Sequence, residues 1–200
     1  GRQFDTPFFQ DQQHRLSILE EHLYELHVRL RREPVFHHRM LSSEETATIA
    51  GAVRSILPAG GHKPGMQIVS LPIWLDAALR IRDQFNYPIL YDCHDLLEGF
   101  KGYSADIQTA EHRLLEEADL LCFSSAHLLA HHTANNPAWA AKSMLVRNAV
   151  DDWLLERVQP DKPPSREPVV GYIGAIEEWL DIDMIRKAAI DLPGCRFVFF

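Results

Sequence analysis

The sequence has few cysteines and no long hydrophobic run, which argues against a disulfide-rich secreted protein and against a membrane-spanning one. Its three cysteines, Cys93, Cys122 and Cys195, are far apart and fall in or beside apolar stretches. They therefore predict reduced residues near a core rather than a disulfide framework. No apolar stretch approaches the roughly 20 residues that a membrane-spanning helix needs. We expect a cytoplasmic protein.

Positive charge is also scarce. The 20 Lys and Arg residues are outnumbered by 28 Asp and Glu residues, which gives a formal net charge of −8, and there is no long basic run. Binding to nucleic acid, or strong electrostatic attachment to anionic lipid, needs a basic surface. The composition therefore argues against a nucleic-acid partner and against such an anchor.

Two catalytic signatures are missing. The chain has no Gly-x-Gly-x-x-Gly spacing of the kind that nicotinamide-binding loops use, and no Gly-x-Ser-x-Gly nucleophile elbow. The sequence therefore gives no support for a nicotinamide-dependent dehydrogenase or for a serine hydrolase.

Short apolar runs alternate with helical patterns along most of the chain. Strands are expected at 67–71, 89–91, 120–123, 143–146, 169–173 and 197–200. Serines that favour helix starts precede several of the intervening helices. We see no hairpin signal. The alternation predicts an α/β fold, a Rossmann-like parallel sheet with helices on both faces.

A leucine pattern marks the first 30 residues. Leucines recur at alternating steps of three and four from Leu16 to Leu30, which predicts a helix with one apolar stripe. Pro34 would end this helix, and Val35 and Phe36 predict the start of a short strand.

A polar, proline-rich segment divides the chain. We predict an amino-terminal domain over 1–155, a linker over 156–168 and a second domain that begins at 169. Because the sequence stops inside the apolar run 197–200, we expect this second lobe to be incomplete.

The stretch from Pro88 to Asp95 contains the strongest candidate site. Its apolar part predicts a buried strand, which ends in Asp92, His94 and Asp95. Ligands of parallel α/β sheets bind just beyond the carboxyl ends of the strands, so a histidine flanked by two carboxylates predicts chemistry there. A helix cap with a hydrogen-bonded loop is the structural alternative.

Five motifs, taken in order, resemble those of a known family. They are Tyr91-Asp92-Cys93-His94-Asp95, Glu111-His112-Arg113-Leu114-Leu115-Glu116-Glu117-Ala118-Asp119, Phe123-Ser124-Ser125, Val146-Arg147-Asn148-Ala149-Val150-Asp151 and Gly171-Tyr172-Ile173-Gly174-Ala175. Over residues 67–200 the set resembles the GT-B glycosyltransferases. It is most similar to the retaining family-four (group 1) type that builds bacterial surface polysaccharides.

The resemblance implies two Rossmann-like domains, the first mainly holding the acceptor and the second mainly holding a nucleotide-sugar. The implied reaction moves a sugar from this donor to a glycan or lipid-linked acceptor, with no metal or other cofactor. A peripheral association with the inner face of the membrane stays open, as do the donor sugar, the acceptor and the oligomeric state.

The resemblance also assigns catalytic candidates. His94 matches a family histidine beside the donor sugar, where it would hydrogen-bond a sugar hydroxyl or steady the oxocarbenium-like charge through its backbone. Asp92 and Asp95 would hold the His94 ring in one tautomer or accept acceptor hydroxyls. Glu111 is expected to have a structural role, bonding the turn at 124–125.

On the donor side the resemblance points to a second set. The candidates are Asn148, Gly171, Gly174, Trp179 and Asp181. Asn148 matches the family's Asn-Gly-Val-Asp motif, although Ala149 replaces the glycine. The two glycines flank a strand end where backbone N–H groups would reach the donor diphosphate. Trp179 and Asp181 would stack or bond nearby. An ordinary asparagine turn and a core tryptophan are the structural alternatives.

Two parts of the family pattern are absent from these 200 residues. A first strand should precede the leucine-rich segment, and the paired glutamates that hold the donor ribose and sugar should follow the last strand. We therefore expect residues 1–200 alone to be a poor or inactive catalyst, because binding both substrates in one geometry needs a full cleft.

Other functions remain open at this point. His127, His131 and His132 fall on one predicted helix, where the first two have the four-residue spacing of a metal-ligand pair. Asp92, His94 and Asp95 could instead serve a metal-dependent hydrolase. A third alternative is a non-catalytic Rossmann-like module that binds a glycan or a partner protein.

Overall fold

The structure is a computed structural model that describes residues 7–10, 14–31, 38–57, 64–100, 102–157, 167–177 and 180–200. The chain forms two compact units, Gly1–Ala149 and Val150–Phe200. The assignment of an acceptor-side domain, a linker and a donor-side domain to these parts stays a prediction.

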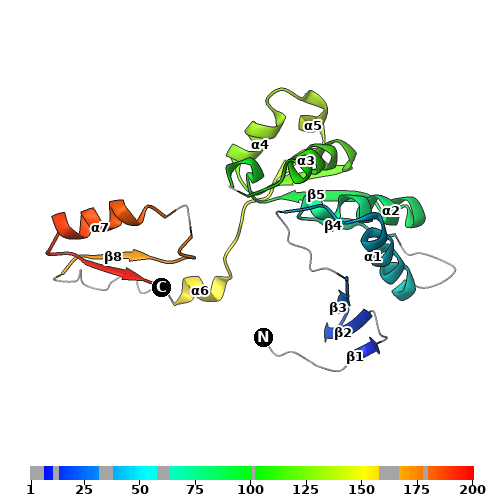
Figure 1. Ribbon diagram of the computed structural model, residues 1–200, viewed down its shortest axis with the longest axis horizontal. Coiled ribbons are helices and arrows are strands. Elements are labelled where there is room, and N and C mark those ends of the chain that lie inside the picture. Colours follow the sequence, from blue (N-terminus) through cyan, green and yellow to red (C-terminus); the bar gives the residue numbers. More distant parts are fainter. Residues whose placement is uncertain are drawn as a thin grey trace. The chain divides into compact units, whose positions relative to one another are not determined.

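A parallel sheet forms the centre of the first unit (Figure 1). Its strands are β4 (Gln67–Val69), β5 (Ile89–Cys93), β6 (Leu120–Phe123) and β7 (Ser143–Leu145), in that spatial order and all parallel. Helices flank the sheet, so the α/β, Rossmann-like class expected from the sequence is confirmed. These four strands lie close to the four expected segments.

Helices connect the strands in the way that the alternating pattern indicated. They are α1 (Ser43–Ile56), α2 (Leu75–Phe85), α3 (Ala105–Glu117), α4 (Ala126–Thr133) and α5 (Pro137–Ala141), with 3-10 turns η1 (Pro72–Trp74) and η2 (Leu97–Gly99). Side-chain oxygens of Ser42, Ser104 and Ser125 accept backbone N–H bonds at the starts of α1, α3 and α4. These caps satisfy donors that helix starts leave unpaired.

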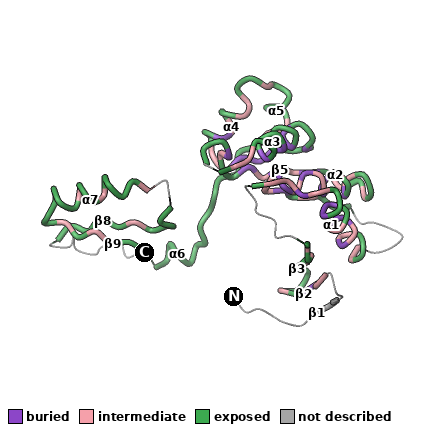
Figure 2. The backbone as a smooth tube through the Cα atoms, in the orientation of Figure 1, coloured by how far each residue is buried: buried purple, intermediate pink, exposed green. Residues whose placement is uncertain are grey.

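The core lies on one face of the sheet. Alternate residues of β5, namely Ile89, Tyr91 and Cys93, are almost completely buried and pack with apolar residues of α2 and α3. On the other face Ile68 and Leu120, which flank Leu90 in the strand register, are exposed. Figure 2 shows the buried residues concentrated in the strands and helices around β5. This central strand therefore anchors the packing of the first unit.

The prediction of an amino-terminal helix over the leucine-rich segment is wrong. The structure instead has an antiparallel sheet of β1 (Pro7–Gln10), β2 (His14–Glu20) and β3 (Leu23–Val28). Leu16 faces Leu26 across the strand pair, and His22 in the connecting turn has a positive φ of 66°. Leucine favours helices, and a Glu-His turn lacks the Asn-Gly signal of hairpins, so local propensity misled the prediction.

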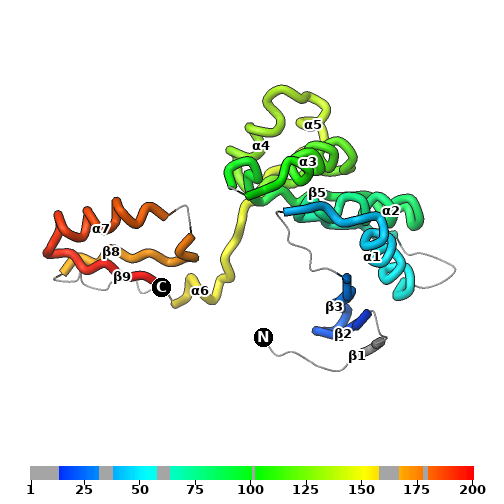
Figure 3. The backbone as a smooth tube through the Cα atoms, in the orientation of Figure 1, coloured from blue at the N-terminus to red at the C-terminus, as the bar shows by residue number. Residues whose placement is uncertain are grey.

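The second unit contains α6 (Asp152–Glu156), β8 (Val169–Tyr172), α7 (Ile182–Asp191) and β9 (Arg196–Phe199), with β8 and β9 paired in parallel. Figure 3 shows the chain passing from β8 through α7 to β9. Both expected strands are confirmed, and none of the described residues of this unit is buried. The strand predicted at Val35 and Phe36, and residues 158–166 of the predicted linker, lie outside the described residues.

The start of α1 is held by an ion pair between the buried Glu45 and the half-buried Arg39. Arg39 donates to both carboxylate oxygens of Glu45, at 2.8 and 2.9 Å, and the Ser42 backbone N–H donates to the same carboxylate at 2.8 Å. These bonds, that of Arg39 first, lower the pKa of Glu45 from 4.5 to about 2. The pair therefore stabilises the fold above about pH 4.5, and this stabilisation declines as the pH falls toward 2.

We predict that Glu45→Gln lowers the free energy of unfolding by about 1–3 kcal/mol at pH 7, because a buried charge-assisted bond is lost. The difference from the unsubstituted protein should shrink as the pH falls from 5 toward 2. Urea unfolding at several pH values measures it. Glu44→Gln is the control, since Glu44 is exposed and its ion pair with the exposed Arg31 is longer, at 3.6 Å. Equal effects of the two substitutions would contradict the prediction.

Candidate functional site

The loop after β5 places His94 and Asp95 at the carboxyl edge of the sheet, and both side chains are exposed. The His94 Nδ1 atom lies 3.3 Å from the backbone oxygen of Asp92, while Nε2 lies 3.6 Å from a carboxylate oxygen of Asp95. A carbonyl oxygen only accepts hydrogen bonds, so this geometry places a proton on Nδ1. The Nε2 atom faces Asp95 and solvent.

The neighbouring strands hold this loop. Ser124, at the end of β6, donates its hydroxyl to the His94 carbonyl at 3.0 Å and its backbone N–H to the Cys93 carbonyl at 3.2 Å. The Asp92 carboxylate accepts a longer bond of 3.4 Å from the Ser70 hydroxyl, which follows β4. Three parallel strands thus fix the loop. The Asp92 carboxylate points to Ser70, so Asp92 contacts His94 only through its backbone. This arrangement argues against a hydrolase site in which Asp92, His94 and Asp95 all bind one metal ion.

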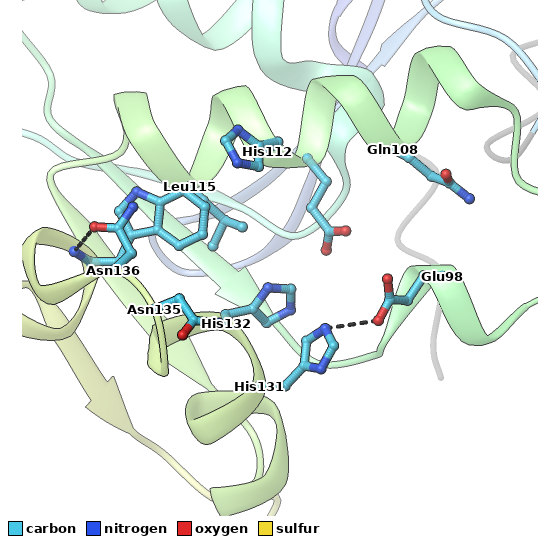
Figure 4. A pocket seen from close by; sticks show the side chains of 10 residues that line it. Glu98, Gln108, His112, Leu115, His131, His132, Asn135 and Asn136 are labelled. Carbon is cyan, nitrogen blue, oxygen red and sulfur yellow. Dashed lines mark hydrogen bonds and ion pairs between the residues drawn. The ribbon is translucent and has the colours of Figure 1, made fainter.

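A cavity of about 390 Å³ opens between α3 and α4, and neither His94 nor Asp95 is part of its lining. Most of its lining is polar: Glu98, Gln108, Glu111, His112, Leu115, His131, His132, Asn135, Asn136 and Trp139. Figure 4 shows Gln108 and His112 projecting from α3 opposite His131 and His132 from α4. The Trp139 ring meets the His112 ring edge-on at 4.9 Å. Aromatic and hydrogen-bonding groups thus converge on one hollow, as in many ligand sites.

The floor of this cavity contains a buried polar network. Tyr91 of β5 donates its hydroxyl to a carboxylate oxygen of Glu111 at 2.9 Å, and both residues are buried. Burial raises the pKa of Glu111 above its ordinary value, and the Tyr91 bond opposes this rise. Burial also raises the pKa of Tyr91. Glu111 does have a structural role. Its hydrogen-bond partner is Tyr91, however, so the expected bond to the turn at 124–125 is wrong.

Cys93 and His132 lie next to this pair. The Cys93 sulfur is 3.8 Å from His132 Nε2 and 3.7 Å from the Asp95 carbonyl oxygen. Burial raises the pKa of the Cys93 thiol to about 12 and lowers the pKa of His132. Both groups are therefore neutral near pH 7, and the thiol does not act as a free nucleophile.

The histidines of α4 have separate partners. His131 Nε2 lies 2.8 Å from a Glu98 carboxylate oxygen at the side of the cavity, drawn as a dashed line in Figure 4. The His127 and His131 rings are 6.4 Å apart. The pair expected from the four-residue spacing thus has one member bound to Glu98, while His132, the next residue, faces Cys93 and Glu111.

The structure also places most of the donor-side candidates. Asn148 is exposed. Gly171 lies in β8, and a Cβ at this position would meet no other atom, whereas Gly174 has a φ of +153° that favours glycine. Asp181 caps α7 by accepting the Met184 backbone N–H at 2.8 Å. Trp179 lies outside the described residues. Donor binding by this set stays a prediction.

Sequence reasoning missed the buried network of Tyr91, Cys93, Glu111 and His132. Tyr91 and Cys93 lie two residues apart on β5, but Glu111 and His132 come from α3 and α4, so no local spacing links them to the strand. The available signal was an acidic residue at an apolar position of α3, because a glutamate on the core-facing stripe of a helix needs a buried partner.

We predict that Tyr91→Phe lowers the free energy of unfolding by about 1–3 kcal/mol, because it leaves Glu111 buried without this donor. The pKa of Glu111 should rise further, which carboxyl NMR can follow. Tyr172→Phe is the control, since the Tyr172 hydroxyl donates to the Ala175 carbonyl at 2.7 Å at an exposed position. A loss with Tyr91→Phe no larger than with Tyr172→Phe would overturn the prediction.

Among the residues that the structure describes, no helix is long and apolar enough to cross a bilayer. No protein-family model matches the chain. The chain is 30% identical over 125 residues, or 56% of its length, to a Bacillus subtilis (strain 168) protein named "Putative teichuronic acid biosynthesis glycosyltransferase TuaH". This match covers 32% of the Bacillus protein, so the chain is similar to about a third of a protein that is named as a glycosyltransferase.

Proposed function

We propose that this chain forms part of a glycosyltransferase of the GT-B, retaining family-four type. It would act in cell-surface polysaccharide synthesis and move a sugar from a nucleotide-sugar to a glycan or lipid-linked acceptor. The observation that carries the proposal is the exposed His94–Asp95 loop at the carboxyl edge of a Rossmann-like sheet. The similarity to TuaH supports the same class of reaction.

In this proposal the imidazole of His94, and not its backbone, contacts the sugar. The His94 carbonyl already accepts the Ser124 hydroxyl, and Nδ1 lies against the Asp92 carbonyl. The Nε2 atom is then the group that can bond a sugar hydroxyl. The Asp95 carboxylate, 3.6 Å from Nε2, can accept an acceptor hydroxyl, while the Asp92 backbone carbonyl accepts the Nδ1 proton.

The second unit would supply the donor contacts. The loop after β8, where Gly174 has a φ of +153°, would bring backbone N–H groups to a diphosphate. The Gly174 N–H itself donates to the Phe200 carbonyl at 3.5 Å, so its neighbours in the loop would make these contacts. Asn148 lies just before this unit. Asp181, as the cap of α7, would position the helix start rather than touch the donor. We propose that transfer needs no metal ion and occurs in the cytoplasm.

The test is sugar transfer by the full-length protein that contains this chain. We predict that His94→Ala lowers kcat/KM by a factor of roughly 10² or more, because a positioned polar group at the reacting sugar is lost. Release of nucleoside diphosphate is followed with a panel of nucleotide-sugars and lipid-linked or glycan acceptors, with and without a chelator. Circular dichroism checks that the fold survives.

His127→Ala is the matched control. His127 is an exposed histidine of α4 with a ring contact to His131, so its removal should leave turnover unchanged. Near-normal turnover by His94→Ala would remove His94 from the catalytic assignment. A protein that binds glycan but releases no nucleotide would favour the non-catalytic module, and metal-dependent hydrolysis without any sugar transfer would favour a metal-dependent hydrolase.

A further inference from the structure

Three metal-binding side chains meet beside the cavity between α3 and α4, which two of them line. The Cys93 sulfur, a Glu111 carboxylate oxygen and a His132 ring nitrogen all lie within 4.8 Å of one another. They come from three elements, β5, α3 and α4, which the core packs together. Thiolate, carboxylate and imidazole are the ligand types that zinc uses in proteins.

The distances suit one shared ion. Zinc bonds of about 2.0–2.3 Å in tetrahedral geometry separate the ligand atoms by about 3.3–3.7 Å. The Cys93 sulfur and His132 Nε2 are 3.8 Å apart. The third atom, a Glu111 carboxylate oxygen, lies within 4.8 Å of both and would move closer to them when the ion binds.

The surrounding residues orient these ligands. The Tyr91 hydroxyl bonds one carboxylate oxygen of Glu111 at 2.9 Å, so the other oxygen remains for an ion. The Phe123 ring stacks on the His132 ring at 5.5 Å with an interplanar angle of 21°, which fixes the plane of the imidazole. Partners of this kind, placed behind the ligands, typically set ligand orientation in protein metal sites.

The cavity gives an ion access and leaves a fourth position open. Glu111 and His132 line it directly, and the Glu98–His131 ion pair stands at its side. A three-ligand zinc site keeps its fourth position for water or another ligand. Here that position would face a hollow of about 390 Å³ with polar walls.

We infer that Cys93, Glu111 and His132 bind one zinc ion, which displaces the Cys93 thiol proton to solvent and ties α3 and α4 to the carboxyl end of β5. This site is separate from the proposed sugar transfer, and its existence does not depend on that function. Because only the folded chain brings the three ligands together, binding of the ion would raise the free energy of unfolding of the first unit.

Cobalt titration of the chelator-treated, reduced protein tests the site. A thiolate bound to Co²⁺ gives a charge-transfer absorption in the near ultraviolet, so one equivalent of Co²⁺ should produce this band and Zn²⁺ should remove it. Cys93→Ser should abolish the band. Cys122→Ala should keep it, because Cys122 is a buried cysteine of the next strand that lies outside the cluster.

A second pair of variants covers the case in which Cys93→Ser does not fold. His132→Asn should weaken Co²⁺ binding at least tenfold, whereas His131→Asn, one residue away and bonded to Glu98, should keep it. Zn²⁺ should raise the Tm of the unsubstituted protein and of His131→Asn, but not of His132→Asn. Absence of the thiolate band in the unsubstituted protein, or equal binding by the two histidine variants, would overturn the inference.

Discussion

The hydrogen bond between Tyr91 and Glu111 constrains how α3 packs on the central strand β5. Tyr91 lies on the core face of the central strand β5, and Glu111 is the polar member of the buried face of α3. Their 2.9 Å bond lets a carboxyl group occupy the core while α3 packs closely on the sheet. It thereby positions the helix that lines the cavity, while Cys93, two residues along β5, faces His132 of α4.

The same strand links the core to the candidate chemistry. Residues that alternate along β5 point to the buried network, while the chain beyond Cys93 turns outward to present His94 and Asp95. Bonds from Ser124 and Ser70 connect this turn to both neighbouring strands. A rigid support of this kind suits a group that has to meet a substrate in one geometry. The proposed sugar site and the inferred zinc site are thus neighbours that share one scaffold.

Much of the fold was predictable, and the exceptions have physical causes. The strands β5 and β6 and the capped helices α1 and α3 follow from apolar runs and serine caps, which act over a few residues. The amino-terminal segment failed because Leu16 and Leu26 satisfy a helical spacing and a cross-strand pair equally well. Strand pairing with other parts of the chain decides between the helix and the strand, and local propensity carries no information about that pairing.

The sequence by itself determined the α/β class and the position of Asp92, His94 and Asp95 at a strand end, because the apolar run and its polar ending are adjacent in the chain. Tertiary structure alone decided which atoms of that motif face solvent, and that Cys93, Glu111 and His132 meet. Those three residues lie 18 and 21 positions apart along the chain, by subtraction of their numbers. Their encounter depends on how β5, α3 and α4 pack, and long-range packing leaves no periodic signal in the residues themselves.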